Sequence, residues 1–513
     1  MRRALRDKVP GRGPVAITAS LPSPAGGWNA RDSLADMAPA DAVLLENWFP
    51  STSELVLRRG YRQYATGFPT QVETVMSYNG TIAGELFGIS GGEVYDATNG
   101  GAVGAAVLTG LTNSRWEWLN VATTGGNFLY MVNGVDDPTL YDGSSWTNPS
   151  ITGVTPENLS NINLHKNRVW FIEENTLKAW YLPAGAIAGA ANDLDMSSVA
   201  QLGGYLVAMA TWTIDAGYGV DDLAVFITTE GEVIVYRGAD PASANDWLLV
   251  GIFRIGAPVG KRCWLKYAGD LLIITNDGVY PLSGALQSSR TNPKVAVTDK
   301  IQTAVGDATT AYGANFGWQL LHFPKGEQLW LNVPTSEGSA QQQYVMNTTS
   351  KAWCNYTGWD ANCWAIYNDD PYFGGNTFIG KAWDTFSDNG ANINADALPA
   401  FNYFGTRGKL KRWTMARPIF RTNGSPALQI NMNVDFDTSD TTSPLNFSPT
   451  NYATWDNAEW DEASWGGGLN ILKNWQGVNG LGYCGSPRLI VASSGIEVSW
   501  VSTDFVMERG GVL

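Results

Sequence analysis

Alternating apolar and polar positions recur along most of the chain in short runs that meet at tight turns. In each case an apolar run reaches a Gly, Asn or Asp turn, and a second short run ends near a tyrosine or tryptophan. Alternation turns one face of a strand toward a core, and glycine or asparagine supplies the positive φ of a tight turn. The pattern therefore predicts seven β-hairpins, at Leu86–Asp96, Tyr130–Asp142, Val169–Leu182, Val225–Tyr236, Leu272–Leu282, Leu329–Asn347 and Tyr372–Asp384.

The repetition of these hairpins predicts how they are arranged. One hairpin cannot bury its own apolar face, so units repeated at similar intervals indicate blades in a ring. We expect an all-β protein whose residues 62–385 form a β-propeller of six or seven blades. The aromatic anchors of the repeat are Tyr95, Tyr141, Tyr181, Tyr236, Tyr280, Tyr344 and Trp383.

The segment before the repeats has a different character. Residues 1 to about 27 are rich in Arg, Pro and Gly, which is typical either of an arm that orders against a partner or of a disordered tail. Pro39–Asn47 predicts a short amphipathic helix that ends before Pro50, and Leu55–Arg58 predicts a strand. We group residues 1–61 as an N-terminal arm, short helix and strand.

The segment after the repeats, residues 386–513, alternates in longer runs and predicts a separate β-sandwich or barrel-like domain. Its expected strands are Phe401–Phe404, Arg417–Thr422, Leu428–Phe436, Arg488–Ala492 and Glu497–Phe505.

Charge is distributed unevenly along the 513 residues. The net charge is −15, yet the first thirteen residues are basic, so the rest of the chain is more acidic than the whole. Duplex DNA carries about one negative charge per ~1.7 Å, and an acidic body does not hold it by releasing counterions. The basic arm is instead a candidate contact with an acidic partner, through Arg2, Arg3, Arg6, Lys8 and Arg12.

Few residues carry the chemistry of catalysis. The chain has only two histidines, and its four cysteines form no C-x-x-C pair. Paired acids at Asp136–Asp137, Asp221–Asp222 and Asp369–Asp370 stand in sequences typical of turns. We therefore expect no catalytic residue, no cofactor and no metal. No apolar stretch long enough for a secretory signal or a membrane span is present.

A basic run stands out within the acidic chain. Residues 406–421 hold six basic side chains and no acid. Contact with phosphate is one interpretation, and contact with an acidic surface of a neighbouring subunit is the one we favour. The candidate contact residues are Lys409, Lys411 and Arg412.

A second unusual segment contains Trp455, Trp460 and Trp465 at a spacing of five, with acids directly after two of them. Three large rings in a polar loop bury little unless they stack on one another or press on a partner. A local cluster that pins the loop and a contact surface are both open interpretations.

Two stretches resemble a known family. In the first, a Gly-x-Asn/Arg-Asp start leads to an Asn-Trp/Phe-Phe-Pro turn and an Arg-x-Gly-Tyr/Phe strand; the second is residues 401–436. Both resemble the tail nozzle, or tail hub, proteins of short-tailed (podovirus) bacteriophages. The matching residues of the first stretch are Gly27, Asn29, Arg31, Asp32, Met37, Ala42, Leu45, Asn47, Trp48, Phe49, Pro50, Arg58, Arg59, Gly60 and Tyr61.

The resemblance implies a structural virion protein in the phage tail that is made in the host cytoplasm and is not an enzyme. It implies a homohexameric ring below the portal, with the tail adaptor (head-to-tail connector) ring on one side and needle, spike or fibre components on the other. During ejection, DNA passes through the channel of this ring without specific binding. From another class, a carbohydrate-binding or glycan-cleaving β-propeller is the alternative that the aromatic loops permit.

Overall fold

The computed structural model describes residues 16–81, 83–215, 220–287, 293–440, 445 and 468–510. Its contacts divide the chain into two compact units. One unit, here called the terminal unit, combines Met1–Arg58 with Asn392–Leu513, and the other, the ring unit, spans Arg59–Ala391. Both consist almost entirely of strands, which confirms the predicted all-β class.

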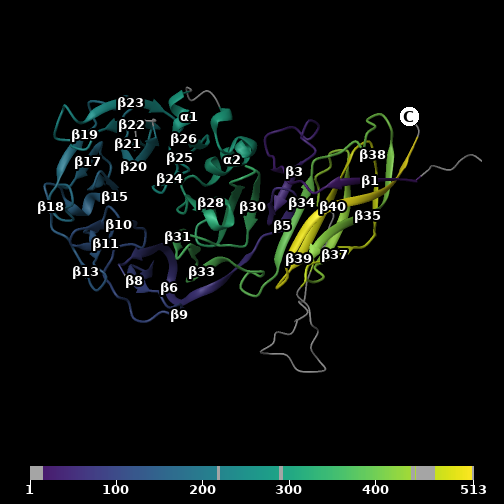
Figure 1. Ribbon diagram of the computed structural model, residues 1–513, viewed down its shortest axis with the longest axis horizontal. Coiled ribbons are helices and arrows are strands. Elements are labelled where there is room, and N and C mark those ends of the chain that lie inside the picture. The colour runs from purple at the N-terminus through teal and green to yellow at the C-terminus, as the bar shows by residue number, and fades with distance from the viewer. Residues whose placement is uncertain are drawn as a thin grey trace, which may run out of the picture. The chain divides into compact units, whose positions relative to one another are not determined.

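The ring unit is a succession of mainly antiparallel sheets in a propeller-like arrangement (Figure 1). In Figure 1 the strands β10, β15, β20, β24 and β31 lie nearest the centre of the ring, and later strands of each sheet lie toward its rim. The strands are β6 (Gly60–Asn79), β7 (Gly84–Ser90), β8 (Glu93–Asp96), β9 (Gly101–Ala102), β10 (Glu117–Thr123), β11 (Gly126–Val132), β12 (Thr139–Tyr141), β13 (Trp146–Thr147), β14 (Ile151–Thr152), β15 (Leu159–His165), β16 (Arg168–Glu173), β17 (Lys178–Tyr181), β18 (Gly189–Ala190), β19 (Asn192–Asp195), β20 (Leu206–Asp215), β21 (Val220–Thr228), β22 (Glu232–Arg237), β23 (Leu248–Arg254), β24 (Trp264–Tyr267), β25 (Asp270–Thr275), β26 (Gly278–Pro281), β27 (Gln319–Phe323), β28 (Gln328–Ser336), β29 (Ala340–Asn347), β30 (Trp353–Thr357), β31 (Cys363–Tyr367), β32 (Asp370–Gly374) and β33 (Asn376–Thr385).

All seven predicted hairpins are confirmed as antiparallel pairs: β7–β8, β11–β12, β16–β17, β21–β22, β25–β26, β28–β29 and β32–β33. The turn between β21 and β22 shows why glycine positions in the sequence predict the hairpins. Gly231 has φ +79°, and a Cβ there would lie 2.5 Å from the carbonyl oxygen of Ile255. Only glycine fits that turn, so the residue marks the hairpin in the sequence.

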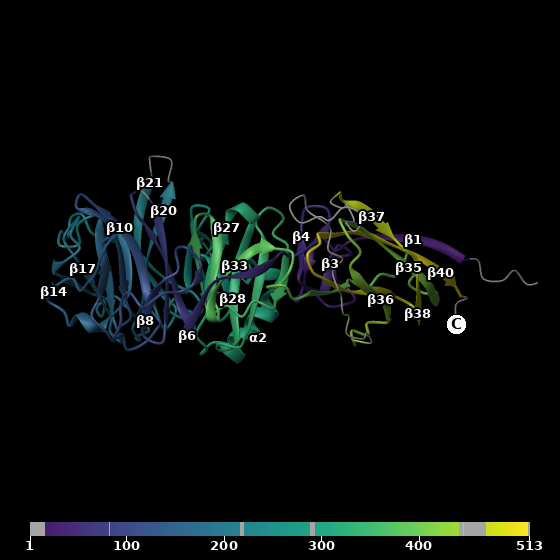
Figure 2. The same ribbon diagram turned by 90° about the horizontal axis from the view of Figure 1, so that it is seen from below.

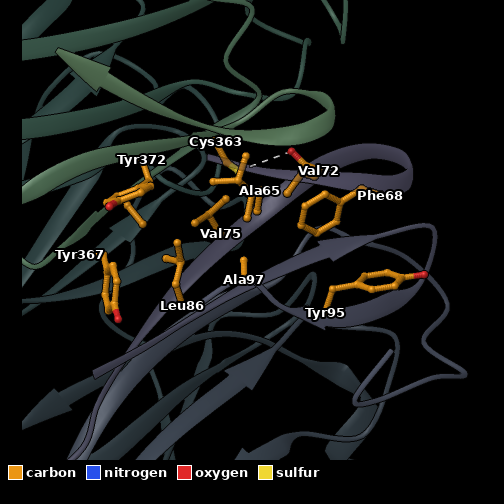
Figure 3. Packing of buried hydrophobic residues seen from close by; sticks show 12 residues of the cluster. Ala65, Phe68, Val72, Val75, Leu86, Tyr95, Ala97, Cys363, Tyr367 and Tyr372 are labelled. Atoms are coloured by element: carbon orange, nitrogen blue, oxygen red, sulfur yellow. Dashed lines mark hydrogen bonds between the residues drawn. The ribbon is translucent and has the colours of Figure 1, made fainter. Parts of the chain in front are cut away.

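Strand β6 closes the ring by belonging to two sheets. Its first half pairs with β33, at Tyr61↔Ala382 and Gln71↔Asn376 among others, and its second half pairs with β7 from Val72 onward. Figure 3 shows the apolar core at this junction, where Phe68 and Val75 of β6 lie near Cys363. The Cys363 Sγ–H donates to the carbonyl oxygen of Val72 over 3.6 Å. The two ends of the ring are thus joined by burial as well as by pairing.

The helices of the ring unit are short and lie between β26 and β27 or at turns. In α2, Val305, Ala308 and Thr309 are buried, and the Thr309 hydroxyl donates to the carbonyl oxygen of Asn276. No helix in the described part of the chain has the length and apolar content needed to cross a membrane. The helices are α1 (Leu282–Gln287) and α2 (Gln302–Tyr312), with 3₁₀ turns η1 (Pro156–Asn158), η2 (Pro293–Val295), η3 (Asp299–Ile301) and η4 (Pro324–Gly326).

The terminal unit contains two groups of paired strands (Figure 2). The first group is β1 (Ala16–Pro22), β4 (Trp48–Pro50), β5 (Leu55–Leu57), β35 (Lys411–Thr422), β37 (Asn470–Lys473), β38 (Gln476–Gly482) and β40 (Val498–Arg509). The second is β2 (Gly27–Trp28), β3 (Asp41–Glu46), β34 (Ile393–Pro399), β36 (Ala427–Val434) and β39 (Gly485–Ser493).

The N-terminal segment is part of this unit and does not stand apart from it as the sequence had suggested. Strand β1 pairs along β40, from Ala16↔Glu508 to Pro22↔Ser502, and β5 pairs with the start of β40. Pairing between segments so far apart in the sequence leaves no periodic signal, which is why the two ends were predicted separately.

The helix expected over Pro39–Asn47 is wrong. Asp41–Glu46 forms strand β3, which pairs with β34 at Leu45↔Ala397 and buries Ala42 and Leu45 completely. A helix this short is not stable by itself in water, whereas a strand gains the hydrogen bonds of its partner. The expected strand at Phe401–Phe404 is also wrong, because only one isolated bridge, Asn402↔Gly485, occurs there.

Candidate functional site at the axis of the ring

A cavity of about 360 Å³ lies where the first strands of several sheets begin. Its lining residues include several at or just before the starts of β10, β15 and β24, strands that lie nearest the centre of the ring in Figure 1. A second cavity of about 230 Å³ shares Ser160, Gly260 and Lys261 with it. The first is lined by Asn113, Arg115, Glu117, Asn133, Val135, Ser160, Gly260, Lys261, Arg262, Gly313, Ala314, Asn315, Phe316, Gly317 and Trp318.

Arg262 is the most buried cation of this cavity, with its side chain 11% exposed. Its Nε donates to the Glu117 carboxylate over 3.0 Å, and Nη2 donates to the Thr74 hydroxyl and the Trp116 carbonyl over 3.0 and 2.8 Å. Arg262 precedes β24, whereas its partners belong to β6, to β10 and to the residue before β10. One guanidinium therefore joins sheets that are far apart in the sequence.

Arg115 makes a second connection between separate sheets of the ring unit. Its Nε donates to Glu73 over 2.9 Å, and Nη2 donates to Glu337, in the turn between β28 and β29, over 3.1 Å. Burial disfavours the charge of Arg115, but attraction to Glu73 and hydrogen bonds to both carboxylates outweigh it and raise its pKa. A group held so firmly in its charged form acts as a fixed structural cation.

Phe316 lies beneath both guanidinium groups. The Cζ atoms of Arg115 and Arg262 lie 4.4 and 5.2 Å from the centre of its ring. The Phe316 backbone N–H donates to Glu337 over 2.5 Å. Such cation–π contacts gain strength when they are shielded from water. We call Glu73, Arg115, Glu117, Arg262, Phe316 and Glu337 the axial cluster.

Lys261 is a weaker member of the same region. It pairs with Glu174 over 2.8 Å, with its side chain 47% exposed. Exposed pairs of this kind contribute about 0–1 kcal/mol. Lys261 therefore offers a matched comparison with the neighbouring buried cation, Arg262.

The axial cluster can hold the sheets together, and its cavity has the size of a small-molecule site, for which ~300–1,000 Å³ is usual. The guanidinium donors of the cluster are already used by carboxylates, carbonyls and a hydroxyl. The axial cluster therefore acts as a structural link, here called a strut, that joins separate sheets of the ring through ion pairs and hydrogen bonds.

Eight of the site residues predicted from the sequence lie outside the described residues. These are Arg2, Arg3, Arg6, Lys8 and Arg12 of the basic arm and Trp455, Trp460 and Trp465 of the aromatic segment.

The other three, Lys409, Lys411 and Arg412, are described and differ in environment. Lys409 and Arg412 are exposed, but Lys411 is fully buried. The Lys411 ammonium donates to the carbonyl oxygens of Thr406, Lys409 and Tyr483 over 2.5, 2.9 and 2.7 Å. Burial, together with the charge of Arg509, lowers its pKa. Lys411 therefore donates hydrogen bonds to backbone carbonyl groups of its own chain. Contact with a neighbouring subunit stays a prediction for Lys409 and Arg412.

Replacing Lys411 by methionine is expected to lower the free energy of unfolding by about 2 kcal/mol, because three carbonyl groups lose a charged donor. Lys409→Met is the matched control and is expected to change it by less than ~0.5 kcal/mol, as exposed substitutions usually do. Urea denaturation followed by tryptophan fluorescence measures both. Equal effects of the two substitutions would contradict the role of the buried ammonium.

Residues that carry the family resemblance form a buried polar network in the terminal unit. Asn29 donates to Asp41 over 2.8 Å, and Arg58 Nε donates to the Asn47 side-chain oxygen over 2.7 Å. The Asn47 amide donates in turn to the carbonyl oxygen of Asn394 over 2.6 Å. Asn47 has φ +59°, a left-handed conformation that asparagine tolerates. These residues join the beginning of the chain to its last part.

The other candidates from the sequence are spread over the ring. Asp136 lies at a turn and accepts from Thr112 and Asn133, but Asp221 and Asp222 lie within β21 and not at a turn. Among the described residues, no group of three or more His, Cys, Asp or Glu could hold a metal ion. The cysteines are buried and free, and burial raises the pKa of Cys263 to about 12.

The described residues thus define an all-β protein with a propeller-like unit. No family model and no curated protein match the chain. It is similar to the solved structure of BBS1N in complex with ARL6DN, with a TM-score of 0.40 and 10% identity, over 64% of this chain and 99% of that one. It is also similar to Raptor of Chaetomium thermophilum, with the same TM-score and identity, over 64% of this chain and 29% of that one. Likeness at this level identifies no activity, ligand or partner.

Proposed function

We propose that this protein is a structural subunit of the tail nozzle, or tail hub, of a short-tailed phage. Six copies form a ring, and DNA leaves through the axis of that assembly. The resemblance of two stretches supports this proposal, together with one contact between them. Trp48 of the first stretch stacks on Phe420 of the second, with ring centres 6.4 Å apart and planes 12° apart.

The axial cluster bears on the path that DNA would take through the assembly. Arg115, Arg262 and Phe316 pack against one another next to the inner strands of the single propeller, so we assign the conduit to the axis of the hexamer and not to one subunit. A net charge of −15 opposes counterion exchange with phosphates, so DNA slides without binding. The proposed function requires no covalent chemistry from any residue.

The finer architecture belongs to the same proposal. We assign seven blades to the ring unit: β6–β8, β10–β13, β15–β17 with β19, β20–β23, β24–β26, β27–β30 and β31–β33, the last completed by the first half of β6. The terminal unit is assigned as a β-sandwich. The basic arm docks on the adaptor ring, and needle, spike or fibre components bind at the other side.

A carbohydrate-binding propeller is the second candidate, because the larger of the two adjoining cavities, of about 360 Å³, has the size of a small-molecule site. Sugar sites commonly use the open face of an aromatic ring. In the larger cavity, Phe316 has guanidinium groups within 5.2 Å of its ring centre. The aromatic ring of Phe316, on which a sugar would stack, is therefore already in contact with Arg115 and Arg262.

Light scattering coupled to size-exclusion chromatography, with negative-stain imaging of the purified full-length chain, tests the proposal. Rings of six subunits are expected, and antibody labelling of virions is expected to mark the tail exit. A variant without residues 1–13 is expected to form the same rings but to lose binding to the adaptor. A monomer at all concentrations that binds or cleaves oligosaccharides would overturn the nozzle proposal in favour of the second candidate.

A further inference from the structure

One face of the sheet around β35 exposes large apolar side chains. Ile471 and Leu481 are 68% and 59% exposed, and Met415 and Trp475 are more than a third exposed. The strands that carry or flank them are β35, β37 and β38, and both β37 and β38 pair with β35. Isolated apolar residues on a surface are ordinary, but several on adjoining strands mark an interaction site.

The register places these side chains on one face. Ile471 is opposite Arg421 and Leu481 is opposite Arg412, all four on the exposed side of the sheet. Their neighbours Trp413 and Phe420 point the other way and are fully buried. We call the face formed by Arg412, Met415, Arg417, Arg421, Ile471, Lys473, Trp475 and Leu481 the outer face.

The outer face carries four cations, Arg412, Arg417, Arg421 and Lys473, and the neighbouring strand β40 places Glu508 opposite Arg412 and Asp504 opposite Arg417. Arg417 pairs with Asp504 over 2.5 Å and lies 4.7 Å from the Trp475 ring centre, and Arg421 pairs with Glu54 over 2.6 Å. Arg412 and Lys473 are exposed and form no ion pair with any residue in the described ranges. Two cations beside four apolar side chains fit a partner that is both acidic and aromatic.

The chain itself contains a segment of that composition. Residues 446–467 include Asp456, Glu459, Asp461 and Glu462 and no basic residue, and the same stretch holds Trp455, Trp460 and Trp465. We propose that the outer face binds residues 446–467 of a second copy of the chain. This proposal rests on the proposed function and names the contact that builds its ring.

Charge, area and symmetry support this occupant. Four acids meet the two unpaired cations, and aromatic side chains bury about 150–250 Å² each, so three tryptophans approach the ~800 Å² per partner of a stable interface. The outer face and the segment are different surfaces of one chain. A contact between two different surfaces, repeated by rotation, generates a ring when the rotation closes and an open filament when it does not, whereas a segment bound to its own chain generates neither.

A fluorescent peptide of residues 446–467 titrated into the full-length W455A/W460A/W465A variant is the direct test. Binding that weakens with salt is expected. The R412E/K473E exchange on that variant is expected to weaken it at least tenfold, and a peptide with its four acids changed to lysine is expected to regain binding. The matched control R254E/K294E exchanges two exposed cations of the ring unit and is expected to leave binding unchanged.

The inference would be overturned if the peptide does not bind, or if its binding is insensitive to R412E/K473E. It would also be overturned if the peptide does not bind a wild-type chain that remains monomeric, because the chain's own segment would then occupy the face. Rings that persist in the triple tryptophan variant would also overturn it while leaving the nozzle proposal standing. A wild-type chain that forms no rings but binds the peptide would support the contact and count against the nozzle.

Discussion

Replacing Arg262 by methionine is expected to lower the free energy of unfolding of the ring unit by roughly 3–5 kcal/mol. Removing one partner of a buried ion pair leaves an uncompensated charge, which costs about that much. Here the charge left behind is the Glu117 carboxylate, whose side chain is 20% exposed. The Thr74 hydroxyl and the Trp116 carbonyl lose a donor in the same step. Urea denaturation followed by tryptophan fluorescence measures the loss.

The neighbouring residue supplies the control for this prediction. Lys261→Met removes a cation of the same cavity, but its pair with Glu174 is exposed, so less than ~1 kcal/mol is expected. Hydrogen exchange provides a local measurement, because the Trp116 N–H donates to Thr74, which itself contacts Arg262. Faster exchange at Trp116 in Arg262→Met alone is expected. Equal losses in the two variants would show that the axial cluster is not a strut.

The hairpins were predictable because their signals are local. Alternation with period two and glycine at the turn both occur within about a dozen residues, as in Val225–Tyr236. The closure of the ring was not predictable in the same way. Gly60–Gln71 pairs with residues about three hundred positions later, and nothing in its own alternation says which strand it will join.

The axial cluster was missed because its members come from separate repeats. Arg115 and Arg262 belong to no motif, and their shared partner, Phe316, follows more than fifty residues later. A signal was present nonetheless. Arg115-Trp-Glu-Trp-Leu and Lys261-Arg-Cys-Trp-Leu both place a basic residue three positions before a Trp-Leu pair at the start of an inner strand. In the second stretch that basic residue is Lys261, so the shared spacing points to this region of the ring but does not single out Arg262, the buried cation of the cluster.

The basic run shows the limit of composition as a guide. Charge alone made Lys409, Lys411 and Arg412 equivalent candidates for a surface contact. Strand alternation then divides them, because Lys411 faces the interior and Arg412 the exposed side. The alternation predicts a buried and an exposed face of this strand. It does not predict that three backbone carbonyl groups on the buried side accept hydrogen bonds from the Lys411 ammonium group.

Acidification from pH 7 to pH 4 is expected to cost the ring unit about 3 kcal/mol through His165 alone. His165 ends β15 and is 1% exposed, and it packs against Trp247 with ring centres 6.1 Å apart. Burial lowers its pKa from 6.5 to about 4, with a smaller opposing effect from the Gly238 carbonyl. One pKa unit corresponds to about 1.4 kcal/mol.

The sign follows from which state binds the proton. Below pH 6.5 the unfolded chain takes up a proton at His165 that the folded chain refuses, so stability is full above that value and falls until about pH 4. His165→Gln abolishes this titration. The stability difference between wild type and variant is therefore expected to shift by about 3 kcal/mol between pH 7 and pH 4 in urea denaturation.

His322 provides the matched comparison for His165. Burial also lowers the pKa of His322, but its side chain is only partly buried, so His322→Gln is expected to give a smaller pH-dependent shift. The proton signal of the His165 ring in an NMR titration reads its pKa directly. A His165 pKa near 6.5 in the folded protein, or the same pH dependence in wild type and His165→Gln, would show that water reaches this end of β15 and that the histidine is not held neutral between Thr211 and Gly238.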